Sequence, residues 1–260
     1  MEKWRLLKLG EVDAYTSNAI TEALGLARSR GIIGNTLALY RPPTFVWLGR
    51  RTSLSQVNVS FCKENEIPIS RSYMGGGVIL YGGQIEYTFV SDETFFPSSD
   101  IAFNILIKCV VKAYQSLGLP AIRRGNSNDI LVGERKITGT GRSRLGSSVL
   151  FTGNFLLDFN YDLAKRVLII PAEKFQDKTA KNVVEWVTSL KKELNREVSF
   201  EEAEIALIQA TGDVLGVQFE EAGLTVEELA IMDELEAKYK SEEWIKYGKW
   251  SPVKDYWRPE

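Results

Sequence analysis

The chain has 260 residues, 44% of them hydrophobic and 25% charged, a composition typical of a globular protein. A formal net charge of −2 excludes a bulk attraction to nucleic acid or to an anionic membrane, and no apolar run reaches the roughly 20 residues of a membrane span. Because the chain has no histidine and starts without the apolar core of a signal peptide, we exclude Ser-His-Asp catalysis and imidazole zinc sites and expect a cytoplasmic protein.

The first half of the chain mixes strand and helix periodicities. In chain order the predicted elements are a strand at residues 4–9, a helix at 13–28, strands at 36–41 and 44–48, and a strand at 84–90. Pro42-Pro43 lies between two of the strands, and we expect these to form a hairpin-like pair. Gly82-Gly83 is expected to be the turn that leads into the last strand.

The second half adds a helix, short strands and a helical end. The predicted elements are a helix at 100–117, strands at 130–132, 136–138 and 149–159, and helices beginning at the capping boxes Ser199 to Glu202 and Thr225 to Glu228. Strict alternation of strand and helix is absent, so we predict an α+β fold with a mixed, largely antiparallel sheet flanked by helices. We expect a main domain over residues 1–220 and a helical tail over 221–260.

Gly75-Gly76-Gly77 lies between Arg71 and an apolar run of β type at residues 78–81. Three glycines allow a backbone to approach a ligand and to turn its N–H groups toward an anion. The spacing fits neither a Walker loop nor a dinucleotide fingerprint, and a flexible turn is the alternative interpretation.

Lys136 begins another short β-like segment. Asn128 and Asp129 precede it with amide and carboxylate oxygens that suit Mg²⁺ or ribose, and Gly139 follows it. An isolated lysine is usually a solvated surface residue, but together with the glycines it could neutralise a carboxylate or phosphate. The combination indicates activation of a small acid by a nucleotide.

Other candidate residues carry weaker signals. We expect Cys109 to lie in the core and regard a nucleophilic role for Cys62 or Cys109 as the less favoured alternative, since no histidine could generate the thiolate. Arg123-Arg124 is expected to make a local salt bridge or to contact an acidic ligand. The lysine-rich stretch 174–181 is either a solvated loop or a flap that closes over an adenylate.

Five segments in this order resemble the lipoate–protein ligase family of the biotin/lipoate ligase superfamily. They are residues 71–82, with the glycine triplet; 128–139, with Asn-Asp and Lys-Ile-Thr-Gly; 155–158, with a Leu-Leu pair; 171–178; and 238–248, with Lys-Tyr, Glu-Trp and Gly. The family pattern has histidine where this chain has Tyr81, and its histidine near residues 151–153 is also replaced. Met74 stands at the family's Ser/Thr position before the glycines.

The resemblance implies the catalytic-domain fold of biotin/lipoate ligases, which is similar to class II aminoacyl-tRNA synthetases. It implies ATP-dependent conversion of lipoate to lipoyl-AMP, with Mg²⁺, and transfer to a lysine of a lipoyl carrier. Lys136 is then the catalytic residue that bridges carboxylate and phosphate, and Arg71 pairs with a phosphate. ATP and acyl-adenylate binding fall to Arg71, Gly75, Gly76, Gly77, Val78, Ile79, Asn128, Asp129 and Lys136. The lipoyl pocket falls to Tyr73, Tyr81 and Gly139, and a Mg²⁺ contact to Asp129.

The implied partners are a lipoyl carrier, of the 2-oxoacid dehydrogenase E2 or glycine cleavage H protein type, and a separate accessory ligase subunit in place of a missing accessory domain. One alternative is an octanoyl or lipoyl transferase, whose relatives use a cysteine nucleophile. Another is a biotin ligase, disfavoured because a Gly-Arg-Gly-Arg signature is absent. A third is a lipoyl-binding homologue without catalytic activity.

Overall fold

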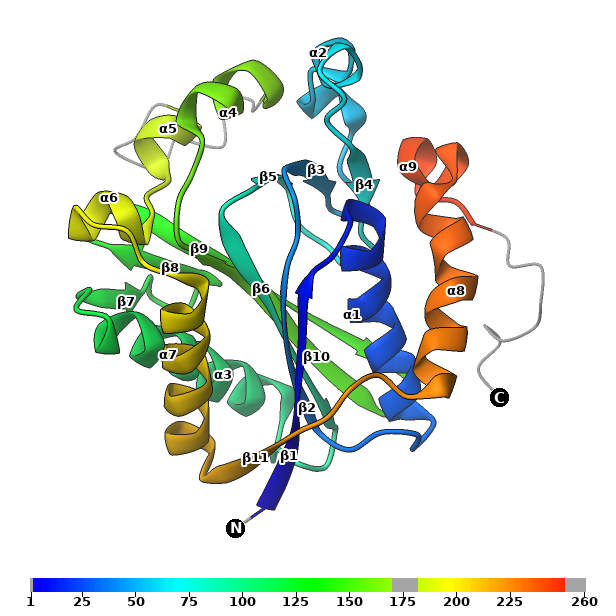
Figure 1. Cartoon of the computed structure of the whole chain (residues 1–260), viewed down its shortest axis with the longest axis vertical. Coiled ribbons are helices and arrows are strands. Elements are labelled where there is room, and N and C mark those ends of the chain that lie inside the picture. The colour runs from blue at the N-terminus through cyan, green and yellow to red at the C-terminus, as the bar shows by residue number, and fades with distance from the viewer. Residues whose placement is uncertain (1, 170–181, 251–260) are drawn as a thin grey trace.

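A large mixed sheet organises the molecule (Figure 1). The computed structural model describes residues 2–169 and 182–250. In spatial order the strands of this sheet are β11 (Val217–Glu221), β1 (Glu2–Glu11), β2 (Thr36–Arg41), β6 (Gln84–Asp92), β10 (Ser148–Leu156), β9 (Arg135–Leu145), β8 (Asp129–Val132) and β7 (Ala121–Arg123). β1 is parallel to both β11 and β2, and every other neighbouring pair is antiparallel. The mixed, largely antiparallel sheet predicted from the sequence is therefore confirmed.

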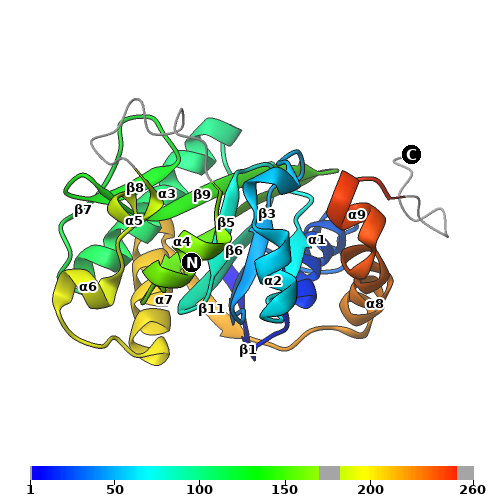
Figure 2. The same cartoon turned by 90° about the horizontal axis from the view of Figure 1, so that it is seen from above.

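A second, smaller sheet contains β4 (Ile69–Arg71), β3 (Phe45–Leu48) and β5 (Val78–Tyr81). Figures 1 and 2 show β3 and β5 between α9 on one side and α4 and α5 on the other. The predicted hairpin of residues 36–41 and 44–48 is wrong, because β2 joins the large sheet while β3 pairs with β4 and β5. Gly82 and Gly83, both with positive φ, likewise carry the chain from one sheet to the other.

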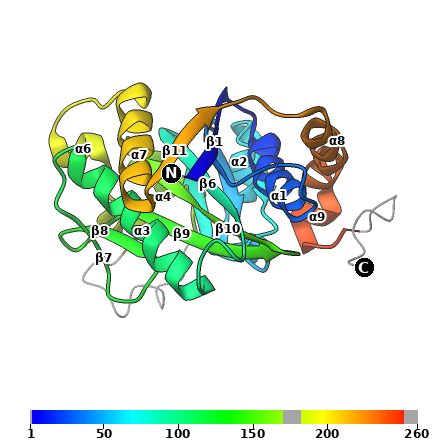
Figure 3. The same ribbon diagram turned by 90° about the horizontal axis from the view of Figure 1, so that it is seen from below.

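Helices cover both faces of the large sheet, as Figure 3 shows from below. α3 (Ser99–Ser116) and α7 (Phe200–Leu215) pack together on one face, and α1 (Ala14–Ser29), backed by α8 (Val226–Lys240), lies on the other. Strand β6 shows why both faces need cover: Ile85, Tyr87 and Phe89 point into the core under α3 and α7, while Val90 points toward α1. The shorter helices are α2 (Val59–Glu64), α4 (Tyr161–Val167), α5 (Val183–Trp186), α6 (Leu190–Leu194) and α9 (Glu242–Tyr247).

Helix α8 is fastened to α1 by a buried ion pair. The Lys238 ammonium lies 2.7 and 2.8 Å from the two carboxylate oxygens of Glu22, whose side chain is 3% exposed, and the Tyr239 hydroxyl donates to the same carboxylate. The predicted capping box at Thr225 and Glu228 starts α8. At Ser199 only half of the box forms, because the Glu202 carboxylate binds Arg196 instead. The boundary predicted at residue 220 lies within β11, so the tail continues directly from the sheet.

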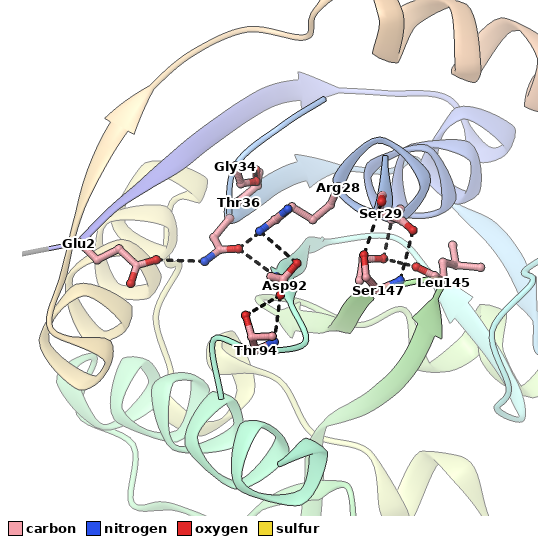
Figure 4. Close-up of polar contacts among 12 residues, drawn as sticks. Glu2, Arg28, Ser29, Gly34, Thr36, Asp92, Thr94, Leu145 and Ser147 are labelled. Atoms are coloured by element: carbon pink, nitrogen blue, oxygen red, sulfur yellow. Dashed lines mark hydrogen bonds and ion pairs between the residues drawn. The ribbon is translucent and has the colours of Figure 1, made fainter. Parts of the chain in front are cut away.

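The opposite end of α1 is tied to the strands by the polar network in Figure 4. The Asn35 amide oxygen accepts from Arg28 and from the backbone of Asp92, and its amide nitrogen donates to Glu2 at 3.1 Å. Thr94 caps the Asp92 carboxylate with its own backbone and hydroxyl groups. These contacts join the start of β1, the end of α1 and the end of β6, and so fix the helix over the sheet. No helix within residues 2–169 and 182–250 has both the length and the apolarity needed to cross a membrane.

Candidate active site

Two cavities meet at the small sheet, and Lys136 lines both. The first, which we call the glycine cavity, has a volume of about 390 Å³ and is lined by Gly75, Gly76 and Gly77 together with residues of β6, β9 and β10. The second, the Trp186 cavity, has a volume of about 250 Å³ and a largely aliphatic and aromatic lining. Gly77, Val78, Ile79, Gly139 and Asn154 belong to both walls. The structure therefore brings the predicted lysine and the glycine triplet to one place.

Strand geometry positions the Lys136 ammonium. A bulge in the β8–β9 ladder pairs Ile130 with Thr138 but Leu131 with Lys136, and such an irregularity redirects side chains locally. The ammonium reaches the carboxylate of Asp129 at 2.6 Å, and both side chains are partly buried. A Cβ atom at Gly139 would lie 2.7 Å from that nitrogen, so a glycine is required for the lysine to lie here. Lys136 is thus a fixed positive charge between two cavities.

The backbone of the glycine triplet is held through its carbonyl oxygens. The carbonyl oxygens of Met74, Gly76 and Gly77 accept hydrogen bonds from Arg50, Thr52 and Gly49 respectively. In the described part of the chain, no protein acceptor is found for the N–H groups of Gly75, Gly76 or Gly77. Consecutive N–H groups of this kind bind anions.

The glycines at 75 and 76 have different surroundings. Gly76 has φ of +151°, and a Cβ there would lie 3.0 Å from the Trp47 ring. A Cβ at Gly75 would meet nothing within 4 Å, because that position faces open space. Gly76 is therefore needed for the fold of the loop, whereas Gly75 is needed only to keep the space in front of the backbone free.

Several other predicted residues lie in the cavity walls. Val78 and Ile79 line both cavities, and Asn128 lines the glycine cavity. The Asn128 amide nitrogen donates to the carbonyl of Thr140 at 2.7 Å, which leaves its amide oxygen for a ligand. Tyr81 also lines the glycine cavity.

Arg71 and Tyr73 lie in surroundings that differ from those expected for a phosphate contact and a pocket wall. The Arg71 side chain is buried, and its three nitrogens donate to the carbonyls of Gly49, Arg50, Thr52, Ile245 and Lys246. It therefore holds the end of α9 against the loop after β3, with no group turned to a phosphate. Tyr73, 7% exposed, packs in the core with α1 and α8 and lines neither cavity.

A buried carboxyl group that the sequence analysis missed lies in the wall of the glycine cavity. Glu86 of β6 lines it together with Thr21, Tyr81 and Thr152. Burial raises the pKa of Glu86 to about 7, although hydroxyl groups of Ser17, Tyr81 and others act in the opposite direction. The sequence signal was an acidic residue on the more polar face of an alternating strand, a face that it shares with Thr88 and Val90.

Neither cysteine belongs to the site. Cys62 packs between α2 and the small sheet, and Cys109 packs in the core under α3. Both are buried, and burial raises the pKa of each thiol, to about 12 for Cys109. A thiolate nucleophile needs the opposite environment, so the prediction that neither acts as a nucleophile fits these positions.

The described side chains offer few ligands for a Mg²⁺ ion. In residues 2–169 and 182–250, no cluster of three or more His, Cys, Asp or Glu side chains could hold a metal ion. The Asp129 carboxylate already holds Lys136. A Mg²⁺ ion here would take most of its ligands from phosphate and water. The predicted flap at 174–181 lies outside the described residues.

The glycine cavity continues outward into an open depression of about 590 Å³. Phe103 of α3 lies under two guanidinium groups there, those of Arg123 and Arg142, at 5.3 and 5.2 Å from the ring centre. Arg142 also pairs with Asp100 at 2.6 Å. Arg124 turns the other way, over the Trp186 ring. Of the predicted Arg123-Arg124 pair, Arg123 therefore lines the entrance beside the glycine cavity.

Comparison with models of protein families matches residues 13–212 to the lipoyl protein ligase A/B catalytic domain. The chain belongs to this family. The matched segment contains every strand that lines the two cavities, from β3 to β10, as well as Lys136 and the glycine triplet. The resemblance inferred from the five motifs is confirmed.

Curated relatives and solved structures within the family differ in activity. The chain is 26% identical to an octanoyltransferase LipM of Kyrpidia tusciae, over 94% of this chain and 98% of that protein, and further octanoyltransferases LipM match over similar lengths. It is also similar to a bi-partite lipoate protein ligase system with its E2 lipoyl domain from Thermoplasma acidophilum, with 29% identity, a TM-score of 0.82, and coverage of 97% of this chain and 100% of that chain. A lipoate-protein ligase A bound with ATP gives 27% identity, a TM-score of 0.81, and coverage of 95% and 99%. These likenesses confirm the predicted fold of ligase catalytic domains.

Proposed function

We propose that the chain transfers a lipoyl or octanoyl group to a lysine side chain of a lipoyl carrier domain. The observation that carries the proposal is the position of Lys136. Its ammonium group is partly buried, lines two cavities and lies near the glycine triplet, for whose N–H groups no acceptor is found in the described residues. Acyl transfer develops negative charge on the carbonyl oxygen and on the leaving group, and preorganised cations and N–H groups stabilise such charge. A site with this arrangement suits an activated acyl group.

We assign the acyl chain to the glycine cavity, which runs past Trp47 toward the core between α1 and the sheet. The leaving group then occupies the Trp186 cavity, whose aromatic and aliphatic lining suits a planar base. In the transfer step the carrier lysine forms the new C–N bond, the bond from the acyl carbon to its leaving group breaks, and the amine gives up a proton. Lys136 and the glycine N–H groups hold the carbonyl and the leaving anion during this step.

Two donors remain as candidates, and each has an observation in its favour. The octanoyltransferases among the relatives favour an acyl thioester delivered by a carrier protein. The buried thiols disfavour an enzyme-bound thioester and favour direct attack on a bound donor such as an acyl-adenylate. The free glycine N–H groups and the ATP-bound structural neighbour agree with that second donor. We extend the proposal to a second ligase subunit, because a bi-partite ligase is among the similar structures.

The test presents the purified chain with an isolated lipoyl domain and weighs the domain by mass spectrometry. One arm supplies lipoate or octanoate with ATP and Mg²⁺, a second supplies an octanoylated acyl carrier protein without ATP, and a third supplies synthetic lipoyl-adenylate. The third arm bypasses adenylation, so it succeeds even when a second subunit is required for that half-reaction. Modification in the second arm alone assigns the transferase, and modification in the first or third assigns adenylate chemistry.

Two variants serve as controls in each arm. Lys136→Ala is expected to slow transfer by about 10²–10³, the usual effect of removing one preorganised charge contact. The double variant Cys62→Ser, Cys109→Ser is expected to keep the wild-type rate, because neither thiol reaches the cavities. A folded wild-type chain that modifies the domain in no arm would overturn the proposal in favour of a binding homologue.

A further inference from the structure

The inner wall of the glycine cavity carries a carboxyl group that acyl transfer does not need. Glu86 is 4% exposed, and its side chain shares the cavity wall with Thr21, Tyr81 and Thr152. It lies on β6 facing α1, whereas Lys136 enters the site from β9. The reacting end and this carboxyl group therefore belong to different strands of the sheet and different parts of the wall.

Among the described residues, the hydrogen-bond partners of the Glu86 carboxyl are hydroxyl groups. Ser17 of α1 donates to one oxygen at 3.1 Å, and the Thr152 hydroxyl of β10 lies 3.4 Å from the other. The phenol groups of Tyr40 and Tyr81 complete the set. No ion pair joins Glu86 to a lysine or arginine in the described part of the chain. This contrasts with Glu22 and Glu228, the other buried carboxylates among the described residues, which pair with Lys238 and Arg5 respectively.

Such a carboxyl group penalises an apolar ligand. A plain hydrocarbon end would lie against a carboxyl group and hydroxyl groups without offering them a hydrogen bond, and an apolar contact with buried polar groups is costly. A ligand end that carries an O–H or N–H could instead donate to a carboxyl oxygen beside these hydroxyl groups. The same burial raises the pKa of Glu86 to about 7.

Resting on the proposed function, we infer that Glu86 makes this chain select an acid whose far end carries a hydrogen-bond donor, in preference to octanoate or lipoate. Thr21, Tyr81 and Thr152 widen the polar patch, and Trp47 supplies the apolar wall along which the methylene chain lies. The substrate class is an ω-hydroxy or ω-amide fatty acid of medium length. The transfer chemistry at Lys136 stays the same.

The test measures binding by calorimetry, apart from any turnover. The ligands are straight-chain acids of six to ten carbons, each as the plain acid and as the ω-hydroxy acid, with lipoate added. At the best-fitting length, wild-type protein is expected to bind the ω-hydroxy acid about tenfold more tightly than the plain acid, as one hydrogen bond to a charged acceptor implies. Glu86→Leu is expected to reverse the order, and Glu86→Gln to keep a weaker preference.

A Glu220→Gln variant, at an exposed site on β11 outside the cavity walls, is the matched control and should bind as the wild type does. Equal or tighter binding of plain acids or lipoate at every length would overturn the inference while leaving the proposed transfer untouched. Survival of the ω-hydroxy preference in Glu86→Leu would overturn it as well. If folded wild-type protein bound none of these acids, the inference would fail, whereas the proposed transfer would still be decided by the arms with octanoylated carrier protein and with lipoyl-adenylate.

Discussion

Replacing Glu86 with glutamine should change how stability depends on pH. The pKa of the buried carboxyl is raised from 4.5 to about 7 because burial disfavours its charge. The native state therefore holds the proton more tightly than the unfolded state does. The stabilisation is fully present below the unfolded pKa and is lost as the pH rises through the folded value. A shift of this size corresponds to about 3 kcal/mol, most of which falls between pH 5 and pH 8. The phenol groups of Tyr40 and Tyr81, which face Glu86, stay neutral in this range because burial raises their pKa.

Urea unfolding of wild type and Glu86→Gln at pH 5 and pH 8 measures the effect. The unfolding free energy of the variant minus that of the wild type should rise by about 2–3 kcal/mol from the lower to the higher pH. The other titrating groups are the same in both proteins, so their contributions to the unfolding free energy cancel in this difference. Glu86→Leu, which also lacks the carboxyl, should show the same rise even if its stability differs at every pH. A difference that stays constant across the range would refute the reasoning, because Glu86 would then ionise alike in both states.

Three further predictions concern the glycine loop and the contacts that hold the helical tail. Gly75→Val should fold normally, since its Cβ meets open space, yet calorimetry should show at least tenfold weaker binding of acids and acyl-adenylates. Gly76→Val should instead lower the melting temperature, because φ of +151° strains any residue with a side chain. Arg71→Met should lower the unfolding free energy by about 2 kcal/mol or more in urea, since it leaves buried carbonyls without a donor; intact stability with weak nucleotide binding would restore its phosphate role. Lys238→Met should cost about 3–5 kcal/mol by leaving Glu22 charged and buried, and the double variant with Glu22→Gln should cost less; equal losses would speak against a coupled pair.

Local periodicity predicted most of the secondary structure but not how strands pair. The helices at 13–28 and 100–117 became α1 and α3 within a residue or two, because their apolar faces repeat at helical spacing. The strands at 36–41 and 44–48 were also predicted, yet their pairing was wrong. Two adjacent strands joined by Pro42-Pro43 look like a hairpin, while the actual partners of β3 lie more than 20 residues further along the chain. The strand β11 escaped notice because it is short, half exposed and next to two helices.

The reactive centre could be predicted better than the side chains around it. A glycine triplet, and a lysine followed by glycine, are local sequence motifs, so Lys136 and residues 75–77 could be identified from the sequence. The structure places them in the wall of one cavity. Arg71 and Tyr73 stand near the same glycines in sequence, but their direction depends on tertiary packing. Arg71 turns to the carbonyls of α9, which no local pattern reveals. Glu86 does face the cavity, but it could not be predicted, because a single acidic residue in a strand belongs to no motif.

Two of the positions at or near which the chain departs from the family pattern lie beside Glu86. The family has histidine where this chain has Tyr81, and another near residues 151–153, and the hydroxyl groups of Tyr81 and Thr152 lie next to the Glu86 carboxyl in this chain. Lys136 and the three glycines keep the family pattern at the reacting end. A change confined to the reacting end would alter catalysis, whereas a change confined to the far wall alters which acid fits. Because Tyr81 and Thr152 share Glu86 as a neighbour, removal of the Glu86 carboxyl should leave little effect for a substitution of Tyr81 or Thr152. Tyr81→Phe and Thr152→Val should therefore weaken the ω-hydroxy preference most in the presence of Glu86 and little in Glu86→Leu, and calorimetry on the double variants can measure that coupling.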